Sequence, residues 1–154
     1  MKNLVAGVDV DGFRTAYALV DEFGKIYAKG SFPTADHKDF KHYVARIKEE
    51  IDALSDSLDI PHKIAAVGIG APNSNYYTGE IENAANLAWK GKLPIGQQLS
   101  QLFDNIPVVV TNDANAAALY NYMDGQFSGK ENFLLLMVDS GIGSGVILNS
   151  RLLH

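Results

Sequence analysis

The chain has 154 residues, of which 47% are hydrophobic and 20% charged, with a formal net charge of -5 and no cysteine. This length fits one ordinary domain, or one domain with part of another, and the composition is globular. The acidic balance without a basic block argues against a nucleic-acid partner, and the lack of cysteine excludes disulfides within this sequence. The apolar stretch after Met1 meets Asp9 too soon for a signal peptide or a membrane span, so we expect a cytoplasmic protein without a membrane partner.

Three short apolar or alternating segments open the chain. They cover residues 4–10, 14–20 and 26–32, and turn-forming residues separate them, including the pair Asp11-Gly12. Asp-Gly readily takes the positive φ angles of a tight turn. The segment therefore predicts a three-stranded antiparallel meander.

One amphipathic helix follows the meander. We expect Asp36 to cap its start, and Pro61 follows its end. The apolar residues that share one helix face recur at alternating steps of four and three: Phe40, Val44, Ile47, Ile51, Leu54 and Leu58.

Two buried strands then alternate with two further helices. Residues 64–70 and 107–111 are almost uninterrupted apolar runs, which are typical of strands buried on both faces. A short helix is predicted over 94–103, with Pro94 in its first turn. An alanine-rich helix begins directly after the second strand, and Gly125 is expected to stop it.

Antiparallel strands followed by crossover helices predict an α/β fold in which a mixed sheet has flanking helices. Near the end, residues 132–140 and 145–149 predict a second hairpin around the glycine-rich residues 140–144. Two strands cannot bury their own faces. We therefore expect residues 1–126 to form one lobe and residues 127–154 to begin a second.

Polar residues at the ends of apolar strands are the candidates for chemistry, because ligands bind there in open α/β sheets. The first group is Thr111 to Asn115. Thr111 or Asn112 could cap a helix, with Asp113 at the positive end of the helix dipole. Alternatively, a carboxylate there could accept a proton from a substrate hydroxyl. The residues alone leave both interpretations open.

The glycine-rich segment 139–145 is the second candidate. It is either a flexible hairpin or a phosphate cradle, in which glycines let backbone N–H groups approach an anion and Ser140 and Ser144 add hydroxyl donors. Asp9 to Thr15 is another candidate phosphate hairpin.

The polar segment 73–92 is the third candidate. It is predicted as a loop, and loops of this length inside compact domains are often functional. Asn83 and Asn86 suit sugar hydroxyls, and Trp89 could cover an apolar sugar face. The alternative is a packed surface loop whose tryptophan fills a hole.

The order of these segments resembles that of ROK-family sugar kinases. The motifs that carry the resemblance are the hairpin 9–15, Gly-Ile-Gly-Ala-Pro at 68–72, Asn-Leu-Ala-Trp at 86–89, Asn-Asp-Ala-Asn-Ala-Ala-Ala at 112–118 and Ser-Gly-Ile-Gly-Ser-Gly at 140–145. Over nearly its whole length, the chain is similar to the amino-terminal half of a glucokinase-like ROK protein. The resemblance implies a ribonuclease-H-like (actin-like ATPase) fold with two lobes, with a sugar between them and ATP with Mg²⁺ across the cleft.

The resemblance also implies roles for individual residues. Asp113 would take the proton from the sugar hydroxyl, and Asp9 would orient Mg²⁺ through water. Asn86 and Asn112 would bind sugar hydroxyls, and Gly70 would border the pocket. The residues that would line the two phosphate turns are Gly12, Thr15, Ser140, Gly141 and Gly143.

Three positions depart from the family pattern. In the first hairpin, which usually reads Asp-x-Gly-Gly-Thr, Asp11 replaces a glycine and Phe13 replaces a hydroxyl residue; Asp139 replaces a glycine in the second loop. Each added negative charge opposes a polyphosphate by about 1 to 4 kcal/mol at roughly 4 Å.

Two functions therefore stay open. One is an ATP-dependent hexose kinase, for which this chain alone is expected to turn over poorly. The other is a non-catalytic sugar-binding or regulatory protein with weakened phosphate binding, and a transcriptional repressor is a weaker third alternative. A homodimer is also open.

Zinc is expected only in a longer parent chain, because the family often carries a cysteine-rich site beyond this part. The four histidines of this sequence, His37, His42, His62 and His154, have no ligand spacing and are expected at the surface.

Overall fold

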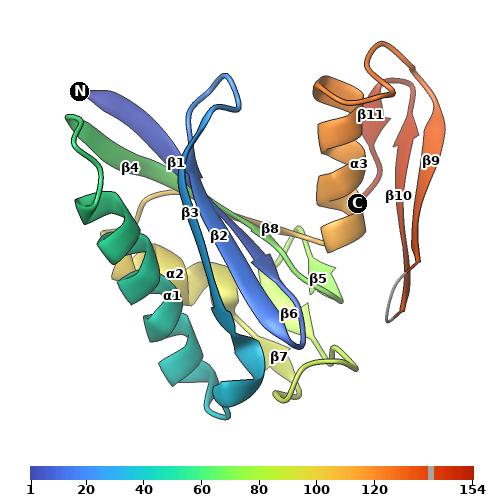
Figure 1. Ribbon diagram of the computed structural model, residues 1–154. Helices are drawn as coiled ribbons and strands as arrows, with labels where there is room; N and C mark the ends of the chain where they lie inside the picture. The colour runs from blue at the N-terminus through green and yellow to red at the C-terminus, as the bar shows by residue number, and fades with distance from the viewer. Residues whose placement is uncertain (139–140) are drawn as a thin grey trace.

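The computed structural model describes residues 1–138 and 141–154. Its main sheet has five strands in the order β3-β2-β1-β4-β8 (Figure 1). β1 pairs antiparallel with β2 and parallel with β4, and β8 extends the sheet parallel to β4. The predicted meander and mixed sheet are thereby confirmed. The strand bounds are β1 Lys2–Val10, β2 Arg14–Val20, β3 Ile26–Pro33, β4 His62–Gly70 and β8 Val108–Thr111.

Helices α1 (Phe40–Asp56) and α2 (Ile95–Leu102) cover one face of this sheet, and α3 (Asp113–Met123) lies on the side of the other (Figure 1). The predicted apolar stripe of α1 faces the sheet and forms the core with it. Side chains that are essentially fully buried there are Leu4, Leu19, Tyr43, Ile47, Ile51 and Ile69. None of the helices within 1–138 and 141–154 has the length and apolar character needed to cross a bilayer.

Asp39 caps α1, so the prediction of Asp36 as the cap was wrong. The Asp39 carboxylate accepts a hydrogen bond from the His42 backbone N–H at 2.9 Å. Asp36 instead ends a short 3-10 segment, Thr34–Asp36. A cap must directly precede the first helical residue, which here is Phe40. Pro94 likewise lies one position outside the first turn of α2, at the N-cap position, where it makes no side-chain hydrogen bond.

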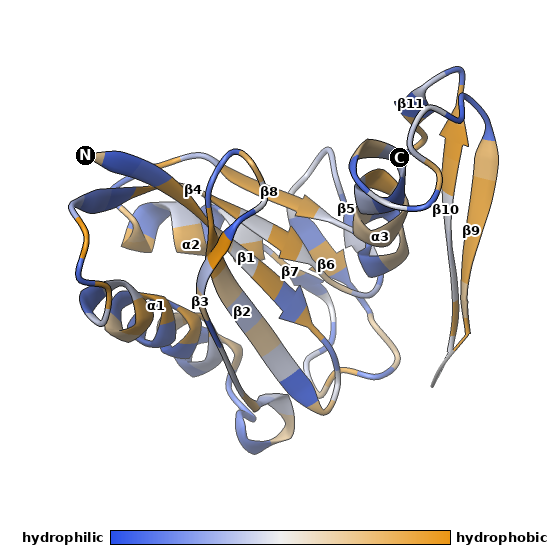
Figure 2. Ribbon diagram, turned by 45° about the horizontal axis from the view of Figure 1, so that its top comes forward, coloured by the Kyte–Doolittle hydropathy of each residue, from blue (hydrophilic) through white to orange (hydrophobic). Residues whose placement is uncertain are grey.

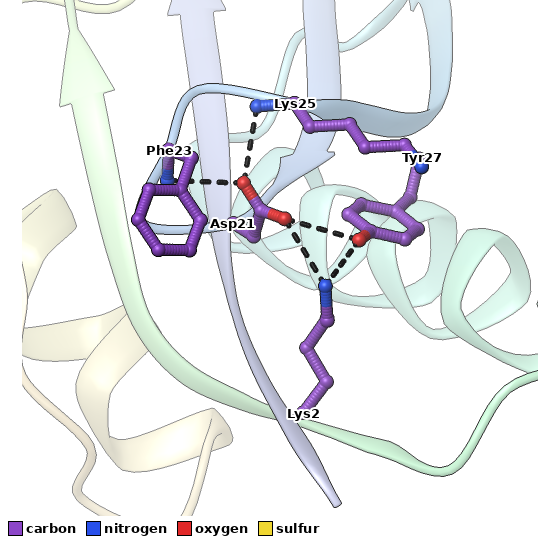
Figure 3. Close-up of polar contacts among 5 residues, drawn as sticks. All are labelled: Lys2, Asp21, Phe23, Lys25 and Tyr27. Carbon is purple, nitrogen blue, oxygen red and sulfur yellow. Dashed lines mark hydrogen bonds and ion pairs between the residues drawn. The ribbon is translucent and has the colours of Figure 1, made fainter.

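Asp21 ties the start of β1 to the β2–β3 turn (Figure 3). Its carboxylate accepts hydrogen bonds from the Lys2 ammonium at 3.2 Å and from the Tyr27 hydroxyl at 3.0 Å. The backbone N–H groups of Phe23 and Lys25 donate to its other oxygen. Burial alone would raise the pKa of Asp21, but these hydrogen bonds outweigh it and lower the pKa.

The segment 73–92 contains a small sheet, although the sequence predicts a loop. Three short strands, β5 (Ser74–Asn75), β6 (Glu80–Glu82) and β7 (Lys92–Leu93), pair in that order. Strands of two or three residues are too short to show an alternating pattern, which explains why the sequence does not reveal them.

The end of the chain forms a separate three-stranded sheet of β9 (Phe133–Val138), β10 (Ile142–Leu148) and β11 (Arg151–Leu152). The predicted hairpin is confirmed, but β10 begins three residues earlier than expected. One face of this sheet packs against α3. β9 is apolar along its length (Figure 2), and its Leu134, Leu136 and Val138 side chains are exposed. The division of the chain at residue 126 stays a prediction.

Candidate active site

Three parallel strands end side by side and align Asp9, Gly70 and Thr111 across the sheet. Asp9 of β1 pairs with Gly70 of β4, which pairs with Thr111 of β8. The carboxyl ends of parallel strands are the usual place for a ligand site. The Thr111 hydroxyl oxygen is buried there without a hydrogen-bond partner among the described residues.

Asp113 begins α3 directly beyond this row. Asn112 caps the helix, because its side-chain oxygen accepts a hydrogen bond from the Ala114 N–H at 3.0 Å. A methyl group on Gly70 would lie 3.6 Å from the Asp113 Cα and 3.9 Å from an Asp9 carboxylate oxygen. Glycine at position 70 therefore leaves the space between the two acidic residues open.

A cavity of about 1050 Å³ opens beside this row of strand ends, and Asp9, Thr111 and Asp113 border it. Its floor is the uncovered face of the sheet, where a methyl group on Gly7 or Gly68 would meet no atom within 4 Å. Other lining residues are Ala16 and Ala18 of β2, Leu119, Tyr120 and Met123 of α3, and Met137 of β9. The volume is sufficient for a small-molecule ligand.

The acidic end of the cavity carries a concentrated negative charge. The Asp9 side chain reaches solvent at the cavity mouth, yet the protein around it raises its pKa, chiefly by removing water. The carboxylates of Asp113 and Asp11 raise this pKa further, and the Arg14 guanidinium opposes them. Such a site favours a cation close to Asp9.

Arg14 lines the cavity, whereas the side chain of Thr15 does not face it. Thr15 is fully buried on the α1 side, and its hydroxyl lies 2.7 Å from both the Thr34 and the Tyr43 hydroxyls. Successive strand residues point to opposite faces, so only one of two neighbours can reach a site. The alternation of β2 already carried this signal, and sequence reasoning overlooked Arg14.

The β1–β2 hairpin touches the segment that carries Asn86. A methyl group on Gly12 would lie 2.3 Å from the Asn86 carbonyl oxygen, so only glycine permits this backbone approach. The Asn86 amide donates to the Asp11 carboxylate at 3.4 Å. The carboxylate of Asp11, which belongs to the hairpin, therefore contacts the loop that carries Asn86.

The glycine-rich segment forms part of a turn, and its glycines also let β10 pack closely against α3. A methyl group on Gly145 would lie 2.5 Å from the Ala118 Cβ, and one on Gly143 would lie 4.0 Å from an Asp113 carboxylate oxygen. Both glycines belong to β10 and allow it to approach the helix that carries Asp113. Gly141 is exposed. Asp139 and Ser140 lie outside the described residues.

Trp89 is a core residue rather than a surface for sugar. Only 6% of it is exposed, its ring centroid lies 4.3 Å from that of Tyr43, and its indole N–H donates to the His37 carbonyl oxygen. The Asn83 side-chain oxygen accepts a hydrogen bond from the Gly91 N–H and so closes the same loop. Of the three sugar candidates in this segment, Asn86 alone is turned toward the β1–β2 hairpin.

Comparison with known proteins identifies the family. Residues 5–154 match the ROK family. The chain is 33% identical over 153 residues to the glucokinase of Halalkalibacterium halodurans, covering 96% of this chain and 45% of that protein. A xylose repressor of Caldicellulosiruptor bescii is 33% identical over 93 residues, covering 60% of this chain and 23% of the repressor. The chain thus spans about half the length of the glucokinase it matches.

A solved structure confirms the fold. The crystal structure of a ROK family glucokinase from Streptomyces griseus in complex with glucose and AMPPNP superposes with a TM-score of 0.83 at 31% identity, covering 97% of this chain and 46% of that one. The mixed sheet with flanking helices is accordingly the actin-like ATPase fold that the family resemblance implies. The chain belongs to the ROK family.

Proposed function

We propose that the protein is a sugar kinase that transfers the γ-phosphoryl group of ATP to a hydroxyl of a hexose. The placement of Asp113 carries this proposal: its carboxylate lies at a helix N-terminus, beside Asp9, on the border of a ligand-sized cavity. The match to glucokinases supports the substrate class. This chain contributes one side of the site.

Asp113 serves as the general base. Its carboxylate accepts the proton of the attacking sugar hydroxyl, while the hydroxyl oxygen forms a bond to the γ-phosphorus. The bond from that phosphorus to the bridging oxygen breaks, and ADP leaves with the electron pair. Asp113 lies in the first turn of α3, at the positive end of the helix dipole.

Asn86 and Asn112 orient the sugar. The Asn112 side-chain oxygen is already engaged in the helix cap, so its amide group is the donor that a sugar hydroxyl would meet. The Asn86 amide projects from the neighbouring loop toward Asp11. Gly70 leaves room between Asp9 and Asp113 for the reacting atoms.

The acidic end of the cavity suits Mg²⁺ bound together with nucleotide. Carboxylate oxygens are the ligands that Mg²⁺ prefers. The pKa of Asp9 is raised chiefly by burial and further by the carboxylates of Asp113 and Asp11, whose repulsion a cation would offset. Within 1–138 and 141–154, no three His, Cys, Asp or Glu side chains form a metal cluster. This fits an ion held mainly by phosphates and water, with Asp9 orienting it. Bound there, Mg²⁺ would neutralise phosphate charge during transfer.

The direct test is a kinase assay on the complete gene product. ADP release is measured with ATP, Mg²⁺ and a panel of sugars that includes glucose, mannose and N-acetylmannosamine. We expect at least one hexose to stimulate ADP release and to appear as a phosphate ester. Sugar binding without any phosphorylated product across the panel would contradict the proposal.

A sugar-responsive regulator is the second candidate. Two observations favour it: Asp11 adds negative charge to the hairpin, and Thr15 is held in the core away from the cavity. The partial match to a xylose repressor points the same way. Calorimetry separates the two, since a regulator of this kind would give heat with sugar and none with Mg²⁺ and an ATP analogue.

A further inference from the structure

The Lys90 side chain hydrogen-bonds to the loop that presents Asn86. Its ammonium donates to the carbonyl oxygens of Ala84 at 2.9 Å, Leu87 at 3.0 Å and Ala85 at 3.4 Å. An ammonium group has three N–H donors, and here each has one acceptor. All three carbonyls belong to the turn that contains Asn86.

Core residues hold the flanks of the same turn. Ala84 is fully buried, Leu87 is 3% exposed and Trp89 is wedged against Tyr43. Asn86 is the exposed member of this turn that reaches across to the β1–β2 hairpin. Apolar packing thus fixes the ends of the turn, and the Lys90 ammonium fixes the direction of the carbonyls on either side of Asn86.

We infer that Lys90 is a positioning residue for sugar binding, acting through Asn86. This inference rests on the proposed function. Without the ammonium, the three carbonyl oxygens would accept hydrogen bonds from water instead, and the loop would occupy several conformations. The apparent affinity for sugar falls in proportion to the fraction of molecules with Asn86 correctly placed. Sugar that does bind selects the correct loop, so the chemical step is largely spared.

Lys90→Met tests this inference in the complete gene product, because methionine keeps an unbranched side chain without the charge. If one molecule in ten retains the correct loop, KM for sugar rises about tenfold, with kcat within about twofold and KM for ATP unchanged. Lys90→Arg should restore most of the affinity, since a guanidinium also offers several donors to carbonyls. Lys92→Met is the matched control, as Lys92 is exposed and its side chain makes no hydrogen bond or ion pair in the described part of the chain.

Asn86→Ala separates this inference from the proposed function. Both single variants should raise KM for sugar, and adding Lys90→Met to Asn86→Ala should have little further effect, because the two act on one contact. If Asn86→Ala leaves KM for sugar unchanged, the assigned sugar contact is wrong. If Asn86→Ala raises it and Lys90→Met lowers only thermal stability, the inference about Lys90 fails by itself.

Discussion

Asp9 lies one residue before the end of β1 and pairs with Gly70 of β4, and its charged form is disfavoured in the folded protein. A carboxyl group with a raised pKa binds its proton more tightly when folded than when unfolded. Folding stability therefore falls as pH rises from about 3.9, the unfolded value, through the folded pKa. An ionised carboxylate that lowers folding stability is expected where a site binds a cation.

Asp9→Asn should therefore raise the melting temperature at pH 7 while abolishing phosphoryl transfer. The stabilisation should disappear below about pH 3.9, where Asp9 is protonated in both states. Thermal melts across this pH range check the expectation, with Asp59→Asn as an exposed control away from the site. A melting temperature for Asp9→Asn below that of the wild type at pH 7 would contradict the electrostatic account.

At the scale of the elements, the side chain of Tyr17 in β2 passes directly over Gly30 of β3 to reach α1. The Tyr17 hydroxyl donates to the Glu50 carboxylate, and burial, followed by this hydrogen bond, raises the pKa of Tyr17 to about 12. A methyl group on Gly30 would lie 2.5 Å from the Tyr17 hydroxyl oxygen and 2.6 Å from the ring carbon that bears it. No side chain fits between them.

Gly30→Ala should lower the free energy of unfolding by about 1 to 3 kcal/mol, because the Tyr17 ring must move off its position. Gly7→Ala is the matched strand control, since its methyl group meets open space. That change should be neutral or stabilising by up to about 1 kcal/mol. Urea denaturation of both variants measures the difference, and equal stabilities would refute the proposed close contact.

The hydrogen bonds of Asp21 should make the β2–β3 turn sensitive to acid. Its pKa lies below the ordinary value of 3.8, so its contribution to stability is complete above that value and is lost as pH falls through the folded pKa. Asp21→Asn should be less stable than the wild type at pH 7, and the gap should narrow below pH 3.8. Denaturation curves of both proteins at pH 7 and pH 3 test this. If the difference in free energy of unfolding is the same at both pH values, the charge of Asp21 is not the cause of that difference.

Sequence periodicity predicts the elements, and side-chain direction explains much of what it misses. The strands of the main sheet, the apolar face of α1 and the cap at Asn112 follow from local patterns. The orientation of Thr15 follows from strand alternation but was assigned from resemblance instead. The contact between Asn86 and Asp11 joins positions 75 residues apart, and no local rule reveals it. Likewise, the residues next to Trp89 in the sequence do not show whether this tryptophan is buried in the core or binds a sugar.

At the scale of the whole molecule, the sheet of β9, β10 and β11 exposes apolar side chains to solvent. Leu136 is 60% exposed and Val138 76%, and Ile142 opposite Val138 is 82% exposed. A contiguous apolar face of this kind promotes association. Contacts beyond those within this chain are therefore needed to cover it.

The 154-residue chain alone should bind a hydrophobic dye and self-associate. Leu136→Ser with Val138→Thr should reduce both without lowering the melting temperature, because these side chains face solvent. Leu135→Ser, on the opposite face toward α3, should destabilise instead. Light scattering and dye fluorescence provide the readout, and a monodisperse wild-type chain without dye binding would show that the face is covered.

The proposed chemistry depends on one carboxylate at the start of α3. The decisive measurement compares kcat and sugar affinity for Asp113→Asn and the wild type in the complete gene product, with Asp124→Asn just beyond the other end of the helix as control. Asparagine keeps the shape but cannot accept the proton, so kcat should fall by about 10² to 10⁴ while the sugar dissociation constant changes little. A kcat for Asp113→Asn within threefold of the wild type would show that Asp113 is not the base.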